Sequence, residues 1–371
     1  MEAGPGPAHG EARLLATRSA PVRSGRPAPT ARAPRPLAHA LPAARALPVL
    51  VLALAAAMLA AVALGSVDVP LGQVVAVLAG RPAAAATRAI VLAIRMPRVV
   101  MAALTGGGLA LSGAVMQGVF RNPLADPGLL GISAGAGFAA VLGIALGVGH
   151  TGLWTLQACT FAGALAGAAL VYVLAVQHGR TPVLTLVLAG VAVSALFAAG
   201  TTLLLTLGPF AADVQAMLQW LYGSLDGALW RQDAALLPFV LVGGGLMVLF
   251  ARELNLLATE EEGAASLGVP VERMRRVLLG LVALVTGAAV AAAGPIAFVG
   301  LMVPHMMRLL VGADHRILLP ASLVGGGAFL VLADLAARTV AAPAELNLGV
   351  VTALLGVPFF LYLLRRAVRG G

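Results

Sequence analysis

The chain has 371 residues, of which 60% are hydrophobic and only 11% charged, and its mean hydropathy is +0.98. This composition excludes an ordinary soluble domain and indicates a polytopic membrane protein, with room for roughly ten spanning helices of about 20 residues. The 24 basic residues are all arginine, so the chain lacks the lysine that a Walker A phosphate loop requires. If ATP drives this protein, a separate chain must hydrolyse it.

The arginines also indicate which way the chain crosses the membrane. With the amino terminus inside, 18 arginines fall in inner segments and 6 in outer segments, which is the bias that sets membrane topology. We therefore expect both termini in the cytoplasm, and we attribute the net charge of +9 to topology rather than to nucleic-acid binding. The single cysteine, Cys159, excludes an intramolecular disulfide.

Two regions differ in composition. Residues 1–46 are rich in Ala, Pro, Gly and Arg and lack a sustained apolar run, which predicts a disordered cytoplasmic tail unless the start codon is misassigned. Residues 47–367 are expected to form an all-α transmembrane domain. Its apolar runs predict ten spans, at about 47–66, 98–120, 127–147, 152–176, 182–207, 233–251, 274–294, 296–312, 317–338 and 348–364.

Two connections between spans are long enough to have structure of their own. Residues 208–232, on the outer side, contain Trp220, Tyr222 and Trp230, which suit a helix at the membrane interface. Residues 252–273, on the inner side, contain a short acidic stretch of helical character. In addition, residues 105–124 and 286–305 align at an offset of 181 with five identities. This suggests a duplicated bundle, as in many transporters, or coincidence in a chain rich in Ala and Gly.

Ionisable side chains are scarce in the spans, which disfavours proton-coupled transport and intramembrane hydrolysis. Asp334 is the clearest candidate, but Arg338 lies four residues later on the same helix face, so a local structural pair is the simpler interpretation. We find no catalytic grouping and no metal-ligand spacing in the sequence, and we expect no cofactor. A pathway lined by Gly, Ala, Ser, Thr and Met suits a bulky, preassembled solute better than a bare ion.

Two loop features are candidates for contacts with other proteins. Arg95, Arg98 and Arg338 lie at outer helix ends, against the topology bias, and could pair with carboxylates of a soluble partner. Snorkelling of these side chains to lipid phosphates is the alternative. On the inner side, the sequence TEEEGAASLGV is either a surface that docks a cytoplasmic partner or an ordinary solvated loop.

Seven motifs follow one another along residues 47–367: RMPR, SGAVMQ, RNPLADPGLLGIS, SLGV, FVGLMVPHMMRLL, GADHRILLP and VVTALLGVPFFLYLLRR. In content and order they resemble the FecCD-type permeases, the membrane subunits of ABC importers for iron-siderophores, heme and cobalamin. The connector motif RNPLADP followed by LLGIS is the most specific of them.

The resemblance implies a permease domain of ten spans that works as a homodimer, or beside a related permease, with the translocation path between the two subunits. It implies two cytoplasmic ATPase subunits and a periplasmic substrate-binding protein as partners, and a location in the cytoplasmic (inner) membrane. Arg95, Arg98 and Arg338 resemble arginines that pair with glutamates of the binding protein, and Asn122 and Leu124 resemble the connector of the cytoplasmic gate. The segment that resembles the ATPase-coupling helix contains Glu260, Glu261, Glu262, Ala264, Leu267 and Gly268.

We therefore expect a translocation subunit rather than an enzyme. It would move siderophore-iron, or else heme or cobalamin, by alternating access while the partner chains hydrolyse ATP. An ion-coupled secondary transporter is the alternative from another class, disfavoured because mid-membrane carboxylates are scarce. Residue types do not distinguish among the three cargos.

Overall fold

The computed structural model describes residues 1, 2, 4, 43–65, 67, 69–148, 152, 154–207, 213–259 and 270–369. The chain divides into two units, Met1–Pro34 and Arg35–Gly371, and the structural account below concerns the second unit. Within its described residues the regular elements are helices, apart from one isolated β-bridge between Gln177 and Arg180. The expected all-α class is confirmed.

Each of the ten expected spans corresponds to an apolar helix. Among the described residues, seven runs are long and apolar enough to cross a membrane: α1 (Ala43–Ala63), the run Ala85–Phe120 that ends with α4, α6 (Thr155–Ala175), α7 (Val183–Thr206), the run Trp230–Leu249 that contains α9 (Trp230–Pro238) and α10 (Gly244–Leu249), α13 (Val271–Ala293) and α15 (His315–Thr339). Three more helices are apolar over a shorter length: α5 (Ile132–Ala145), α14 (Val299–Val311) and α16 (Leu348–Arg369).

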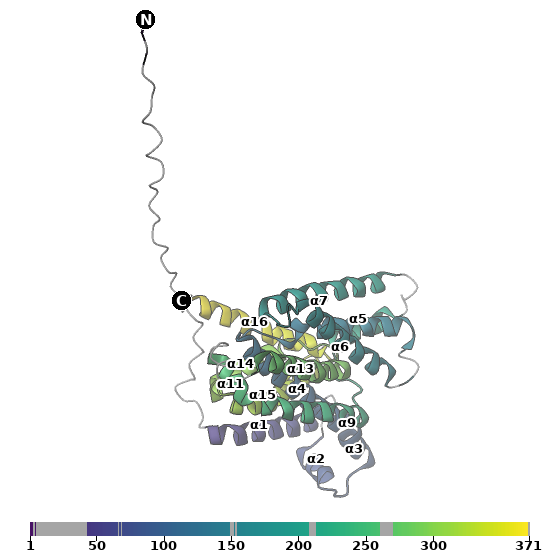
Figure 1. Cartoon of the computed structure of the whole chain (residues 1–371). Helices are drawn as coiled ribbons and strands as arrows, with labels where there is room; N and C mark the ends of the chain where they lie inside the picture. The colour runs from purple at the N-terminus through teal and green to yellow at the C-terminus, as the bar shows by residue number, and fades with distance from the viewer. Residues whose placement is uncertain are drawn as a thin grey trace. The chain divides into compact units, whose positions relative to one another are not determined.

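Helix α4 (Met96–Phe120) is the most deeply buried element, since 20 of its 25 residues are buried. It packs against α13, α14 and α15 (Figure 1). Gly106 of α4 and Gly326 of α15 face one another so closely that a Cβ on either would overlap the backbone carbonyl of the other. Small residues at such crossings let helices approach in lipid, where dispersion forces rather than water drive association.

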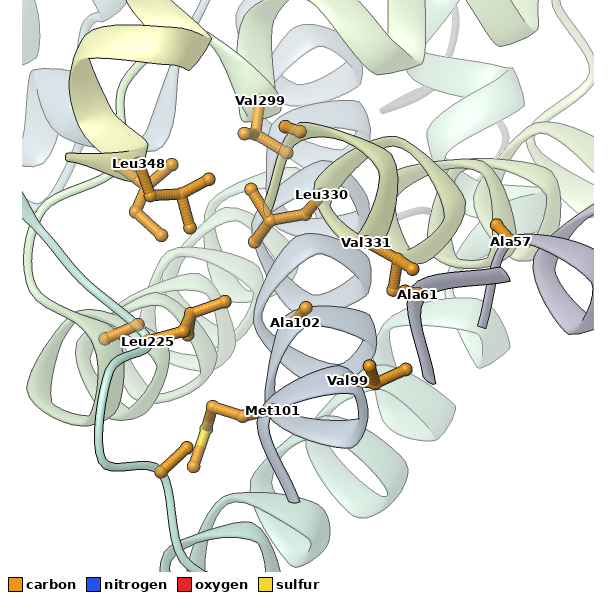
Figure 2. Packing of buried hydrophobic residues seen from close by; sticks show 14 of the residues in the cluster. Ala57, Ala61, Val99, Met101, Ala102, Leu225, Val299, Leu330, Val331 and Leu348 are labelled. Carbon is orange, nitrogen blue, oxygen red and sulfur yellow. The ribbon is translucent and has the colours of Figure 1, made fainter. Parts of the chain in front are cut away.

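Side chains from several helices, among them α1, α13, α14 and α15, form the apolar core around the first half of α4. Figure 2 shows Ala102 of α4 near Val331 of α15 and Ala61 of α1. All three are buried, with exposed fractions of 2% or less. A second buried cluster surrounds the other half of α4 and includes Met116.

The chain before α4 contains helices that hydropathy did not predict. A short helix α2 (Leu71–Leu78) is followed by α3 (Ala85–Ala89) and by a π-helical turn, η1 (Ile90–Arg95), that continues directly into α4. The resulting run has 36 residues. Arg95 and Arg98 therefore lie inside a continuous helix rather than at its start.

The two segments that align internally follow different backbone paths. Residues 105–124 lie within α4 and its C-terminal turn, whereas residues 286–305 cross a break between α13 and α14. At this break Gly294 and Phe298 both adopt positive φ, 72° and 68°. Three of the five identities still pair residues of α4 with residues of α13, at 105/286, 106/287 and 110/291, and the other two fall at or beyond the break. The duplicated bundle therefore stays a prediction.

Short helices occupy both long connections. Helix α8 (Val214–Tyr222) lies in the outer connection, which was expected to hold an interfacial helix. Elsewhere, between α4 and α5, η2 (Pro127–Leu130) is a short 3-10 turn. Helix α11 (Ala251–Thr259) begins the other long connection. The six residues assigned to ATPase coupling, between 260 and 268, lie outside the described residues.

Candidate functional site

An apolar cavity of about 880 Å³ lies along α16. Its walls come from the first half of α16, the end of α8, the break between α13 and α14 with the start of α14, and residues 126–133, which include η2 and the start of α5. Such a volume and such a lining are typical of sites for small organic molecules or cofactors. The lining residues are Asp126, Gly128, Ser133, Leu221, Tyr222, Pro295, Ile296, Ala297, Phe298, Leu301, Gly349, Val350, Ala353, Leu354, Val357 and Pro358.

A tight connector, residues 121–126, adjoins one end of this cavity. Helix α4 ends at Phe120, and the left-handed conformation of the next residue, Arg121 (φ 50°), turns the chain. The Asn122 backbone N–H donates to the Gln117 carbonyl over 3.2 Å, and the Asn122 Oδ1 accepts from the Leu124 N–H over 2.9 Å. Both Asn122 and Leu124 are exposed, so the residues predicted to form a gate present their side chains at this surface. We call this end of the bundle the connector end.

Asp126 links the connector to the cavity. Its Oδ1 accepts the Gly128 N–H over 2.7 Å and so caps η2, and its side chain also lines the cavity. It is the one charged residue among the lining residues given above. Burial raises the pKa of the Asp126 carboxyl, and the hydrogen bond from Gly128 only partly opposes this effect.

The opposite end, which we call the arginine end, holds an ion-pair cluster. Arg98 Nε lies 3.0 Å from Asp334 Oδ1, and Arg338 Nε lies 3.0 Å from Asp334 Oδ2. Asp334 is 1% exposed. The Asp334–Arg338 pair expected from the sequence is confirmed, and Arg98 joins it from α4. A buried carboxylate held by two guanidiniums is stable only while both remain in place.

Arg98 also reaches two carboxylates at the surface. Its Nη2 lies 2.9 Å from Glu345 Oε2, and its Nη1 lies 3.7 Å from Asp226 Oδ1. The side chains of Glu345 and Asp226 are 41% and 81% exposed, whereas that of Arg98 is 11% exposed. Sequence reasoning missed these two partners because they lie in loops 128 and 247 residues away from Arg98, where no local pattern marks them.

Arg95 and Arg338 are committed to the backbone of α1 and the loop after it. Arg95 Nη1 donates to the carbonyls of Val62 and Ala63 over 2.7 and 2.8 Å, and its Nη2 donates to Val67. Arg338 Nη2 donates to the Ala61 carbonyl over 3.1 Å. Each arginine is only 5% exposed. The structure therefore brings the three predicted docking arginines to one end of the bundle but engages each of them within the chain.

A second cavity, of about 660 Å³, borders this cluster. Its lining includes Asp226 and Glu345, the two exposed partners of Arg98, together with Asp213. The arginines thus lie behind an acidic rim rather than at the open surface. An incoming carboxylate would have to replace one of these partners to reach Arg98.

These features together define a polytopic helical protein with a large apolar cavity and a tight connector beside it, an arrangement suited to moving a solute. The family model described as the FecCD transport family matches residues 52–366. The chain therefore belongs to the FecCD transport family.

Relatives within this family are permeases of ABC importers. The chain is 49% identical over 281 residues to the cobalamin import system permease protein BtuC of Halobacterium salinarum, covering 76% of this chain and 74% of that protein. It is 43% identical over 285 residues to the hemin transport system permease protein HmuU of Yersinia pestis, covering 74% and 83%. A solved structure described as an inward-facing conformation of a metal-chelate type ABC transporter matches with a TM-score of 0.78, at 30% identity, over 87% of this chain and 99% of that one. The chain is thus a multi-pass permease subunit of an ABC importer, as the motifs predicted.

Proposed function

We propose that this permease imports a bulky metal-containing organic molecule by alternating access through the cavity along α16. The observation that carries the proposal is the cavity itself, which is large, apolar and adjacent to the connector. Cobalamin and hemin are the cargos named for the relatives above, so we rank these two ahead of siderophore-iron. A ring system with a large apolar surface gains the most from such walls.

The cavity has an open side, and we infer that a second permease closes it. Helix α16 exposes Leu354 (66%) and Leu361 (51%), and α7 exposes Leu184 (69%) and Leu196 (62%). Apolar faces of this kind meet either lipid or another apolar surface. Since Leu354 both lines the cavity and is exposed, a second copy of this chain placed against α16 would complete the wall. A homodimer is our proposal, and a related paired permease is the alternative.

The orientation follows from the arginine bias described above. We propose that the connector end faces the cytoplasm of a cell whose inner membrane holds the protein, that both termini are cytoplasmic, and that two separate ATPase subunits bind at this end. The segment 260–268, with Glu260, Glu261, Glu262, Ala264, Leu267 and Gly268, would seat on them. Asn122 and Leu124, exposed at the connector, would form the cytoplasmic gate.

A periplasmic binding protein would then dock at the arginine end. We propose that Arg98 makes the principal contact, because a carboxylate of the binding protein can replace Glu345 or Asp226, which are exposed. Arg95 and Arg338 would hold the docking surface in shape through their backbone contacts. Such docking exchanges an ion pair within the permease for one with the binding protein. It therefore orients the binding protein more than it strengthens the binding.

Transport by the reconstituted importer tests the proposed cargo. The permease, its ATPase and its binding protein would be placed in liposomes, and ATP-dependent uptake of cobalamin, heme and a ferric siderophore would be compared. We expect uptake of cobalamin or heme and little of the siderophore. Uptake of the siderophore alone would contradict the ranking of cargos, and uptake of none of the three would contradict the cargo class.

A further inference from the structure

One amide side chain joins α11 to the start of α15. The Asn255 Nδ2 donates to Asp314 Oδ1 over 2.7 Å. The Asn255 Oδ1 accepts the backbone N–H of His315 over 2.9 Å and lies 2.8 Å from the His315 Nδ1. The amide nitrogen of Asn255 thus donates to the N-cap of α15, and its amide oxygen accepts from the first residue of that helix. We call these three residues the α11–α15 clamp.

Asp314 has a second task within the clamp. The same Oδ1 accepts the backbone N–H of Arg316 over 3.0 Å, so Asp314 is the N-cap of α15. These hydrogen bonds hold the pKa of the Asp314 carboxyl below its usual range. A movement of Asn255 therefore acts directly on the first turn of α15.

The clamp packs against the last turn of α4. A Cβ added to Gly118 would lie 2.8 Å from His315 Nε2 and 3.1 Å from the Leu254 side chain. Leu254 and His315 are buried, 0% and 4% exposed, and the His315 ring is held at its other nitrogen by Asn255. Helices α11 and α15 therefore both pack against α4 at Gly118, where a side chain larger than hydrogen would collide with the His315 ring.

That turn of α4 leads into the connector. The Gly118 carbonyl accepts the Arg121 N–H over 3.3 Å, and the Gln117 carbonyl accepts the Asn122 N–H over 3.2 Å. The Gln117 side chain accepts a further hydrogen bond from buried Arg308 over 3.0 Å. A shift of the turn at Gly118 would thus carry Asn122 with it.

We propose that the α11–α15 clamp transmits movement from the ATPase-coupling segment to the connector, and that Asn255 is the positioning residue of this path. Helix α11 ends at Thr259, immediately before that segment, so a push on the segment acts on α11 through the chain itself. The inference rests on the proposed function, in which ATPases bind this segment and the connector is a gate. Packed helices with two discrete arrangements are the physical means by which such coupling travels.

Three substitutions separate the clamp from ordinary packing. Asn255→Asp removes the donor and sets a carboxylate against that of Asp314, so it breaks the link between these two side chains while keeping an acceptor for His315. Asp314→Asn keeps an oxygen that can accept from both Asn255 and Arg316, so it preserves the clamp and is the matched control. The double substitution Asn255→Asp with Asp314→Asn reverses donor and acceptor and restores one hydrogen bond between the two side chains.

The measurement uses the complete importer in liposomes, with a thiol as reporter at the gate. Leu124→Cys would be introduced in a Cys159→Ser background, and its rate of reaction with a membrane-impermeant maleimide would be compared with and without ATP. ATP hydrolysis would be measured on the same samples. In the parent we expect ATP to change the labelling rate by about fivefold or more, the lower range of allosteric coupling.

The proposal predicts that Asn255→Asp abolishes most of this change while ATP hydrolysis continues, and that Asp314→Asn and the double substitution keep it. An Asn255→Asp complex with the parent's ATP response would overturn the clamp. The clamp would also be overturned if the double substitution hydrolyses ATP normally but its labelling rate does not respond to ATP. The lost hydrogen bond would then not be the cause of the defect in Asn255→Asp. A parent complex whose labelling ignores ATP would instead contradict the proposed function, and the clamp's role with it.

Discussion

The contact between α5 and α6 is set by glycine, and Gly167→Ala tests how closely helix approach is required. A Cβ at position 167 would lie 2.5 Å from the Gly131 carbonyl oxygen and 3.2 Å from its carbon. Both atoms belong to the backbone, so no side chain can rotate away. Ordinary contact begins at 3.4 Å, so the two elements must separate locally by roughly 1 Å, a gap that forfeits a quarter to a half of each neighbouring dispersion contact.

Overpacking of this kind costs about 1–3 kcal/mol, and we expect about 3 kcal/mol here because the obstacle is backbone. Gly280→Ala in α13 is the matched control, since nothing lies within 4 Å of the added methyl. Alanine there gains up to about 1 kcal/mol in helix propensity. In thermal unfolding of the detergent-solubilised permease, Gly167→Ala should melt on the order of 5–10 °C below the parent, and Gly280→Ala at or above it. Equal melting of the two variants would refute the reasoning.

Three further predictions concern the two ends of the bundle. Glu345→Gln removes a carboxylate that competes for Arg98. In surface binding measurements it should tighten docking of the binding protein a few-fold, roughly the worth of one exposed ion pair. Weaker docking would mean that Glu345 itself makes the contact. Arg98→Glu should lower the free energy of unfolding by about 3 kcal/mol or more, because it leaves buried Asp334 facing a like charge; unchanged thermal stability would contradict the cluster. Asp126→Asn keeps an acceptor for the Gly128 N–H but carries no charge. Because burial raises the pKa of Asp126 in the folded state, ionising this carboxyl destabilises the parent as pH rises. The variant should therefore have a higher melting temperature than the parent at neutral pH, and this difference should shrink as pH falls. A difference in melting temperature that grows toward acid pH would show that folding lowers the pKa of Asp126.

Deleting residues 260–266 tests the coupling segment. We expect the complex to retain ATP hydrolysis on its partner subunits but to lose cargo uptake, because the mechanical link to the permease is gone. Uptake and hydrolysis measured together in liposomes would decide this, and unchanged uptake would remove the coupling role from the segment.

The ten spans could be predicted from the sequence because the bilayer imposes length and apolarity on each of them separately. The way in which the helices pack against one another, and the short helices between them, could not be predicted in the same way. Residues 71–78 and 85–95 form helices although Arg88 and Arg95 lie in the second of these stretches, and hydropathy alone predicts a loop for such a segment. The break from residue 294 to 298 was predicted as the boundary between two spans, and it opens on Gly294, which has a positive φ of 72°, followed by Pro295.

The candidate site also has a part that could be predicted from the sequence and a part that could not. The connector was recognisable because Asn-Pro and Asp-Pro pairs dictate local turns, and the structure places Asn122 and Asp126 in such turns. The arginine cluster depends on contacts between distant segments, since Arg98 and Asp334 are 236 residues apart. Sequence reasoning found the three arginines and the pairing of Asp334 with Arg338, but the carboxylates that cover Arg98 emerge only from the fold.

The central claim is that this permease has no motor of its own and moves cargo only with an external binding protein and internal ATPases. Uptake into liposomes tests it directly, comparing the complete importer supplied with ATP against the permease alone under a proton or sodium gradient. We predict uptake only by the complete importer and only with ATP. Gradient-driven uptake by the permease alone would contradict the account.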